Sequence, residues 1–133
     1  MTVTRLGHKT VLVIEDDPWT RTITTALLAG EGFAVVEAKN GEEGLKQARA
    51  HTPDAILLDL ALPTKSGLEV LRELKRDAST RQIPVIVVSA YGTLMNDGDA
   101  RQTVGVIQKP FDYDDLVGQV ERATASSLEV ALT

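Results

Sequence analysis

Polar residues that could carry phosphoryl-transfer chemistry stand at the ends of four short apolar segments of the sequence. They are Glu15 with Asp16, Asp59, Ser89 and Lys109. If the fold gathers them, carboxylates about 4 Å apart repel by about 4 kcal/mol at an effective dielectric near 20, so a cation must compensate. Mg²⁺ binds through carboxylate, water and phosphate oxygens. The set therefore predicts a site at which a bound metal assists phosphoryl transfer.

Three of these residues are expected to act on the phosphoryl group itself. Asp59 is the expected nucleophile, because a carboxylate can accept a phosphoryl group as an acyl phosphate. Lys109 would neutralise the transferring oxygens, since positioning and electrostatics supply nearly all of the catalysis in such reactions. Ser89 would donate a hydrogen bond to one of these oxygens, although it could instead cap the segment that follows it.

The remaining groups are candidate ligands of the metal. Asp16 is expected to hold Mg²⁺ directly, together with Asp59, and Glu15, which is longer by one methylene, to hold it through a water molecule. The backbone carbonyl of Ala61 could complete the shell. Asp17 is left out, because an acid directly before Pro18 is typical of a helix N-cap with proline at the first helical position.

The elements that must position these residues follow from the apolar pattern. Short β-branched segments alternate with segments of helical spacing, which is typical of a parallel sheet covered on both faces. We therefore expect an α/β, doubly wound five-stranded fold, in which ligands bind beyond the carboxyl ends of the strands. The expected strands are residues 11–14, 33–36, 55–58, 84–88 and 105–107.

Most of the helix starts are marked by single residues. Asn40 and Ser66 have an acid three residues later, the spacing of a capping box, and Asp112 can cap the last helix. The fourth helix, within residues 93–101, contains the turn-forming run 96–99, so we expect it to be short or irregular. The tail 125–133 is expected to be a frayed extension of the last helix or disordered.

Length and composition bound the possible functions. The 133 residues (14.3 kDa) suit one domain, 1–133, with a core of about 9–124. A net charge of -5 argues against nucleic-acid binding, and the absence of cysteine excludes disulfides and thiolate metal sites. No apolar run approaches the roughly 20 residues of a membrane span, and no signal peptide is apparent. The expected location is the cytoplasm, without membrane contact.

Taken together, the motifs resemble the receiver domain of two-component response regulators, the CheY-like family. They are the apolar-Glu-Asp-Asp-Pro run at 13–18, Asp-Leu-Ala-Leu-Pro-x-x-x-Gly at 59–67, Val-Val-Ser-Ala at 87–90 and Lys-Pro-Phe at 109–111. The resemblance implies a strand order of 2-1-3-4-5 and a cis peptide before Pro110. It also implies Mg²⁺-dependent transfer to Asp59 from a histidine kinase or phosphotransfer protein. Such a domain is not an enzyme in the ordinary sense, although it assists its own phosphorylation and dephosphorylation.

Some positions depart from the family pattern. Val106 stands where receivers usually carry the Tyr or Phe of a ring switch, so the output route is expected to differ. Tyr91 and Ala61 occupy positions through which the family varies its dephosphorylation rate. Trp19 and Tyr113, both at helix starts, are expected to be packing residues.

Several functional hypotheses are compatible with the sequence. Because the chain ends soon after the last helix, we expect a receiver that acts without a DNA-binding output domain. The alternatives are a receiver from a hybrid kinase or longer regulator, and a pseudo-receiver that binds partners without phosphorylation. A metal-dependent phosphatase or a nucleotide-binding domain fits less well, because the turn at 15–18 is acidic and lacks a glycine-rich phosphate cradle.

Overall fold

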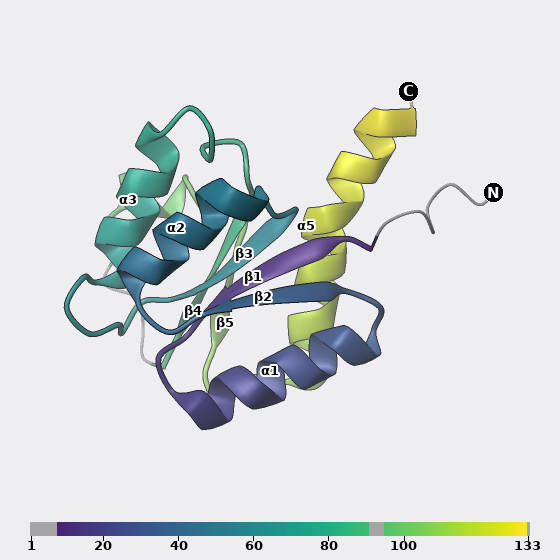
Figure 1. The fold of residues 1–133 in the computed structure, drawn as a ribbon, viewed down its shortest axis with the longest axis horizontal. Coiled ribbons are helices and arrows are strands. Elements are labelled where there is room, and N and C mark those ends of the chain that lie inside the picture. Colours follow the sequence, from purple (N-terminus) through teal and green to yellow (C-terminus); the bar gives the residue numbers. More distant parts are fainter. Residues whose placement is uncertain (1–7, 91–94, 133) are drawn as a thin grey trace.

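Five parallel strands form the centre of the molecule in the computed structural model of the chain (Figure 1). The structure describes residues 8–90 and 95–132, with the side chains of 126–132 excepted. The sheet order β2-β1-β3-β4-β5, with parallel neighbours throughout, confirms the predicted doubly wound topology. The strands are β1 (Thr10–Ile14), β2 (Ala34–Ala38), β3 (Ala55–Asp59), β4 (Val85–Ser89) and β5 (Gly105–Gln108).

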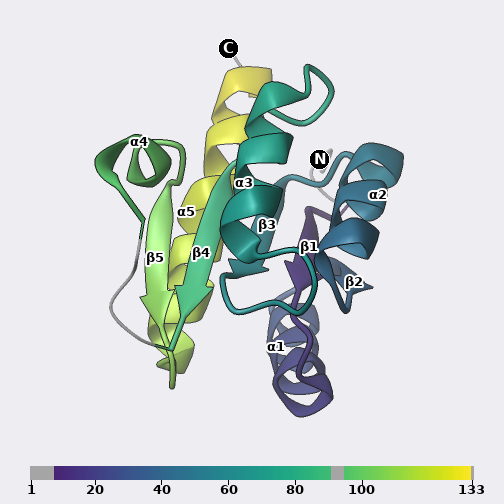
Figure 2. The ribbon, with the colours of Figure 1, turned by 90° about the vertical axis from the view of Figure 1, so that its left-hand side faces the viewer.

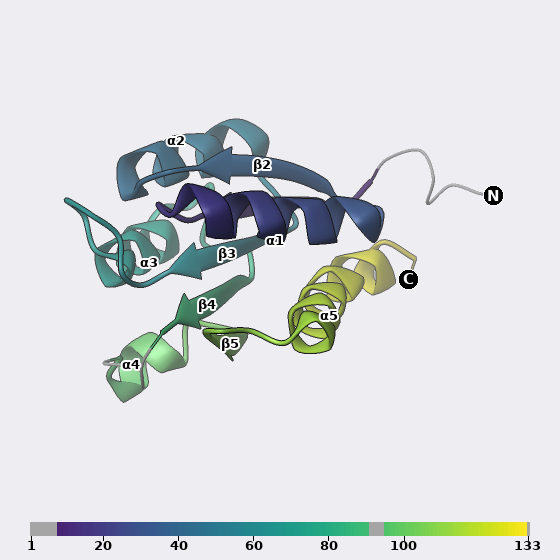
Figure 3. The ribbon, with the colours of Figure 1, turned by 90° about the horizontal axis from the view of Figure 1, so that it is seen from below.

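Helices cover both faces of this sheet. One face carries α1 and α5, and the other carries α2 and α3, so that the strands lie in a middle layer (Figures 1 and 3). The helices are α1 (Pro18–Gly30), α2 (Gly41–His51), α3 (Gly67–Arg76), α4 (Asp97–Ala100) and α5 (Tyr113–Leu132). The single turn of α4 confirms the expectation of a short fourth helix, and α5 continues through most of the expected tail.

The core forms because alternate residues of the inner strands enter opposite layers. In β1, Leu12 and Ile14 join the cluster beneath α2 and α3, whereas Val11 and Val13 join the cluster beneath α1 and α5. All four side chains are buried, as expected of a strand covered on both faces. The edge strand β2 differs: it extends beyond the predicted 33–36 to Ala38, because an edge position tolerates the exposed Glu37 inside a strand.

The predicted caps define where the helices begin. The Asp17 carboxylate accepts the Thr20 amide at 2.8 Å, and Ser66 forms a complete capping box with Glu69. Asn40 caps α2 through the amide of the residue three positions later. Such caps contribute about 1 kcal/mol each. At α1 the cap also sets the direction in which the chain leaves the end of β1, where the acidic residues lie.

Two close contacts fix how α3 packs on its neighbours. A side chain at Gly67 would collide with the backbone of Asp59 and Leu60, so glycine lets the start of α3 approach the end of β3. Farther along α3, Arg72 donates to the buried Asp99 carboxylate through Nη2 at 2.7 Å and Nε at 3.1 Å. This bidentate pair holds α4 against α3, at the side of the sheet near β4 and β5 (Figure 2).

Candidate functional site

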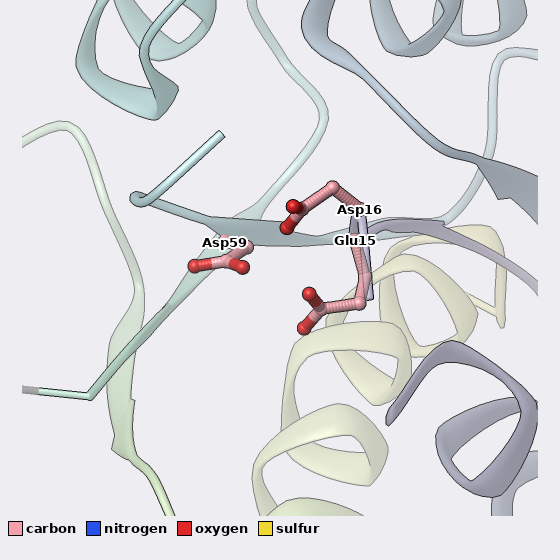
Figure 4. Close-up of side chains that lie close together, drawn as sticks. All are labelled: Glu15, Asp16 and Asp59. Atoms are coloured by element: carbon pink, nitrogen blue, oxygen red, sulfur yellow. The ribbon is translucent and has the colours of Figure 1, made fainter. Parts of the chain in front are cut away.

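Three carboxylates meet beyond the carboxyl ends of β1 and β3. Glu15 and Asp16 follow β1, Asp59 is the last residue of β3, and their side chains turn toward a common space (Figure 4). One oxygen from each lies within 4.8 Å of the others. Glu15 and Asp59 are each 4% exposed, whereas Asp16 is open to solvent. The adjacency of β1 and β3 thus brings together the acids that the sequence singled out.

Lys109, which follows β5, also reaches this cluster. Its Nζ donates to Glu15 Oε1 at 2.7 Å and to Asp59 Oδ2 at 3.2 Å. Its backbone amide donates to the carbonyl of Ser89 at 2.8 Å, and its peptide to Pro110 is cis, as expected. The structure therefore places the predicted lysine among the predicted acids, although residues 15 and 109 lie 94 positions apart in the chain.

The balance of charge in the cluster is negative. Burial raises the pKa of the Glu15 carboxyl to about 7; the nearby Asp59 adds to the rise, and the hydrogen bond from Lys109 opposes it. Burial disfavours the charged form of Lys109, but its hydrogen bond to Glu15 and the charge of Asp59 outweigh this and raise its pKa. One ammonium group thus faces three carboxylates, an excess that a divalent cation would neutralise.

The donor set suits Mg²⁺ in chemistry and in accessibility. All three side chains offer carboxylate oxygens, the ligands this cation prefers. Both oxygens of Glu15 already accept hydrogen bonds, from Lys109 and from the Asp17 amide at 3.1 Å. Within the described part of the chain, the Asp16 carboxylate accepts none. Asp16 is therefore the acid most open to direct coordination.

The Asp59 carboxylate is oriented through both of its oxygens. Oδ1 accepts the amide of Ala61 at 3.0 Å, and Oδ2 accepts Lys109. Ser89 is half-buried at the end of β4, next to Val88, which is the register partner of Asp59. The predicted serine therefore stands beside the predicted nucleophile at the same end of the sheet.

The comparison with known families agrees with this geometry. A family model described as the response regulator receiver domain matches residues 11–121. The chain belongs to this family. Receivers are signalling domains of two-component systems, which interact with a kinase or phosphotransfer partner and are not enzymes in the ordinary sense.

Relatives of this receiver include a polar-differentiation response regulator and solved receiver structures. It is 39% identical over 94 residues to the polar-differentiation response regulator DivK of Brucella anthropi, covering 71% of this chain and 76% of the relative. The receiver domain of sensor histidine kinase PA1611 from Pseudomonas aeruginosa, solved with a magnesium ion in its active-site cleft, is 26% identical (TM-score 0.81; 90% and 99% coverage). A CheY-like receiver from Methanospirillum hungatei shares the fold, with 24% sequence identity and a TM-score of 0.84; the match covers 92% of this chain and 98% of the other.

Two aromatic residues of the receiver differ from expectation. Trp19 was expected to pack, but its side chain is 73% exposed, and Tyr113 is 42% exposed, with its hydroxyl bonded to Glu31. The buried residues of α1 are Thr24 and Leu28. Trp19 lies five residues before Thr24, and because an α-helix has 3.6 residues per turn, this spacing places Trp19 on a different side of α1 from the buried face. The expected role of Tyr91 falls on a residue outside the described part.

The sequence did not predict a surface hollow that lies next to Lys109. It has a volume of about 420 Å³ and is lined by α1 and by the turn that follows β5. Its lining residues are Thr20, Ile23, Lys109, Pro110 and Phe111. Trp19 and Ile23, spaced i and i+4, are both exposed apolar residues of α1, and that spacing is the signal that could have revealed an outward apolar stripe.

Val106, whose side chain has no aromatic ring, is 44% exposed on β5. No helix in the described part of the chain has both the length and the apolar character needed to span a bilayer.

Proposed function

We propose that this receiver accepts a phosphoryl group on Asp59 from a phosphohistidine of a histidine kinase or phosphotransfer protein. The observation that carries the proposal is the contact of a buried Asp59 carboxylate with Lys109, beside the carboxylates of Glu15 and Asp16. A buried acid among acids is costly unless its site recruits positive charge, and phosphoryl transfer needs that charge.

The transfer step follows from the orientation of Asp59. A carboxylate oxygen attacks phosphorus, an O–P bond forms, and the P–N bond to the donor imidazole breaks, with its electron pair staying on the nitrogen. Lys109, which already contacts Oδ2, neutralises the oxygens of the group in transfer. Ser89, at the end of the neighbouring strand, donates a hydrogen bond to one of them.

The reaction is proposed to depend on Mg²⁺, which supplies charge neutralisation for the phosphoryl oxygens when bound. Asp16 and Asp59 would hold it directly, Glu15 through water, and Ala61 through its backbone carbonyl. The same residues assist the later hydrolysis of the acyl phosphate. The new charge and its hydrogen bonds to Ser89 and Lys109 then shift an equilibrium between two conformations, which is the signal.

The donor protein is proposed to dock on the hollow between α1 and the turn after β5. Ile23 and Phe111 line it and Trp19 adjoins it as a neighbour of Thr20, so an apolar helix surface beside the donor histidine would fit. Lys109 lines this hollow and also contacts the carboxylate cluster. The proposal applies to a single domain with a core of about 9–124, whether it acts by itself or within a longer regulator.

Incubation with acetyl phosphate or phosphoramidate tests the proposal. With Mg²⁺ the intact protein should gain the mass of one phosphoryl group, located at Asp59 by peptide mapping, and the gain should vanish with EDTA or in D59N. A wild-type protein that is never modified would contradict the proposal and favour a pseudo-receiver. Catalytic turnover of p-nitrophenyl phosphate would favour a phosphatase instead.

A further inference from the structure

The position of the Asp16 carboxylate is set by the backbone. Among the described residues, no group donates a hydrogen bond to this carboxylate, and the residue is exposed. Its direction therefore depends on the main chain of residues 15–17, here called the acid turn. Whatever holds the carbonyl groups of the acid turn also determines where the Asp16 oxygens lie relative to Asp59.

Arg21 is the side chain that holds these carbonyls. One turn into α1, its Nη1 donates to the carbonyl oxygen of Glu15 at 2.8 Å, with a longer contact of 3.4 Å to that of Asp16. The Arg21 side chain is only 19% exposed. A planar guanidinium can satisfy two acceptors at once in a fixed geometry, which suits it to bracing a turn.

The guanidinium is itself held from the other side. Its Nε lies 3.6 Å from Glu37 Oε1 on β2, and Thr25 donates its hydroxyl to Glu37 Oε2 at 2.5 Å. A chain of contacts thus runs from the edge strand through Arg21 to the acid turn. None of these contacts involves the carboxylates of Glu15, Asp16 or Asp59.

We propose that Arg21 is a positioning residue of the metal site, which orients the Asp16 carboxylate through the backbone of the acid turn. This inference rests on the proposed Mg²⁺-dependent function. Residues that orient metal ligands from behind typically change metal affinity by ten- to a hundred-fold when removed. Because the contact is to carbonyl groups, we expect the lower end, a loss of about tenfold in Mg²⁺ affinity.

The sign of the effect separates this role from simple electrostatics. Arg21 carries a positive charge close to a site for a cation, so its removal would tighten Mg²⁺ binding if charge alone mattered. Loss of positioning weakens binding instead. A purely structural role would lower the melting temperature and leave the affinity unchanged.

The experiment measures Mg²⁺ affinity well below the melting temperature of each variant. Trp19, the only tryptophan of the chain and three residues from Asp16, serves as the fluorescence probe, and titration calorimetry provides a second readout. Arg21→Met should weaken binding by about tenfold. Arg21→Lys keeps the charge but loses the planar fork, so it should also weaken binding, and it keeps the test decisive if R21M does not fold.

The matched control is Arg49→Met. Arg49 pairs with Asp77 at 2.9 Å, remote from the site, and its side chain is 50% exposed. This variant should bind Mg²⁺ within about twofold of the wild type. Unchanged or tighter binding in both Arg21 variants would overturn the inference while wild-type phosphorylation still stands. A wild type that binds no Mg²⁺ would instead overturn the proposed function.

Discussion

The buried Glu15 carboxyl makes the stability of the metal-free protein depend on pH. Its pKa is raised from an ordinary 4.5 to about 7, chiefly by burial. Between these two values the folded protein keeps the proton and the unfolded chain has lost it. The folded state therefore binds more protons, and its stability must fall as the pH rises through this window.

The magnitude follows from the size of the shift. A rise from 4.5 to about 7 corresponds to roughly 3 kcal/mol of destabilisation at high pH, most of which develops between about pH 5 and pH 8.5. Because the cluster opens to solvent at Asp16, screening reduces the effect, and we expect about 2 kcal/mol.

Urea denaturation of the wild type and Glu15→Gln in EDTA measures this effect. The glutamine side chain is neutral throughout, so titration of the other groups largely cancels in the difference between the two proteins. The variant should gain about 2 kcal/mol on the wild type from about pH 5 to pH 8.5. A constant difference across that range would show that the Glu15 carboxyl ionises normally and would refute the reasoning. Saturating Mg²⁺ should reduce the wild-type pH dependence, because it favours the ionised form.

Further predictions concern three other positions. Asp16→Asn should raise the stability of the metal-free protein by up to about 1 kcal/mol, because it removes a charge that lies about 5 Å from the other carboxylates in solvent. The same change should weaken Mg²⁺ binding. A lowered melting temperature in EDTA would contradict the crowding of the acids. Thr24 is buried beside a cavity of about 10 Å³ lined also by Glu15 and Asp59, and its hydroxyl has no hydrogen-bond partner among the described residues. Thr24→Val should therefore stabilise the protein by about 1 kcal/mol in thermal or urea unfolding, and a loss of stability would indicate a bridging water in that cavity. Arg72→Met should break the tether to Asp99, lower the melting temperature and speed amide exchange in α4; unaltered exchange there would show that the pair does not hold this helix.

The fold was predictable because its signals are local. β-branched segments, helical spacing and the caps at Asp17 and Ser66 act over a few residues, and the alternation they define leaves a parallel sheet as the natural solution. The same pattern placed the acids, Ser89 and Lys109 at the ends of their strands. The family likeness then supplied the strand order, which the topology confirms.

Other features depend on how distant segments pack. The sequence predicts that Lys109 belongs to the site, but only the packing of β5 beside β4 shows that it pairs more closely with Glu15 than with Asp59. The raised pKa of Glu15 likewise follows from burial, a property of the assembled layers. The residue type of Trp19 does not predict its exposure. A tryptophan at a helix start faces the core or the solvent according to which side of α1 packs on the sheet.

The sequence by itself thus determined which residues stand at the carboxyl end of the sheet and what chemistry their types allow. Tertiary structure decided which of those residues touch, which are shielded from water, and that Arg21 braces the turn carrying Asp16. The physical reason is that residue types and short-range spacing are properties of the linear sequence. The distances between side chains and their desolvation arise only when segments as far apart as β1 and β5 meet.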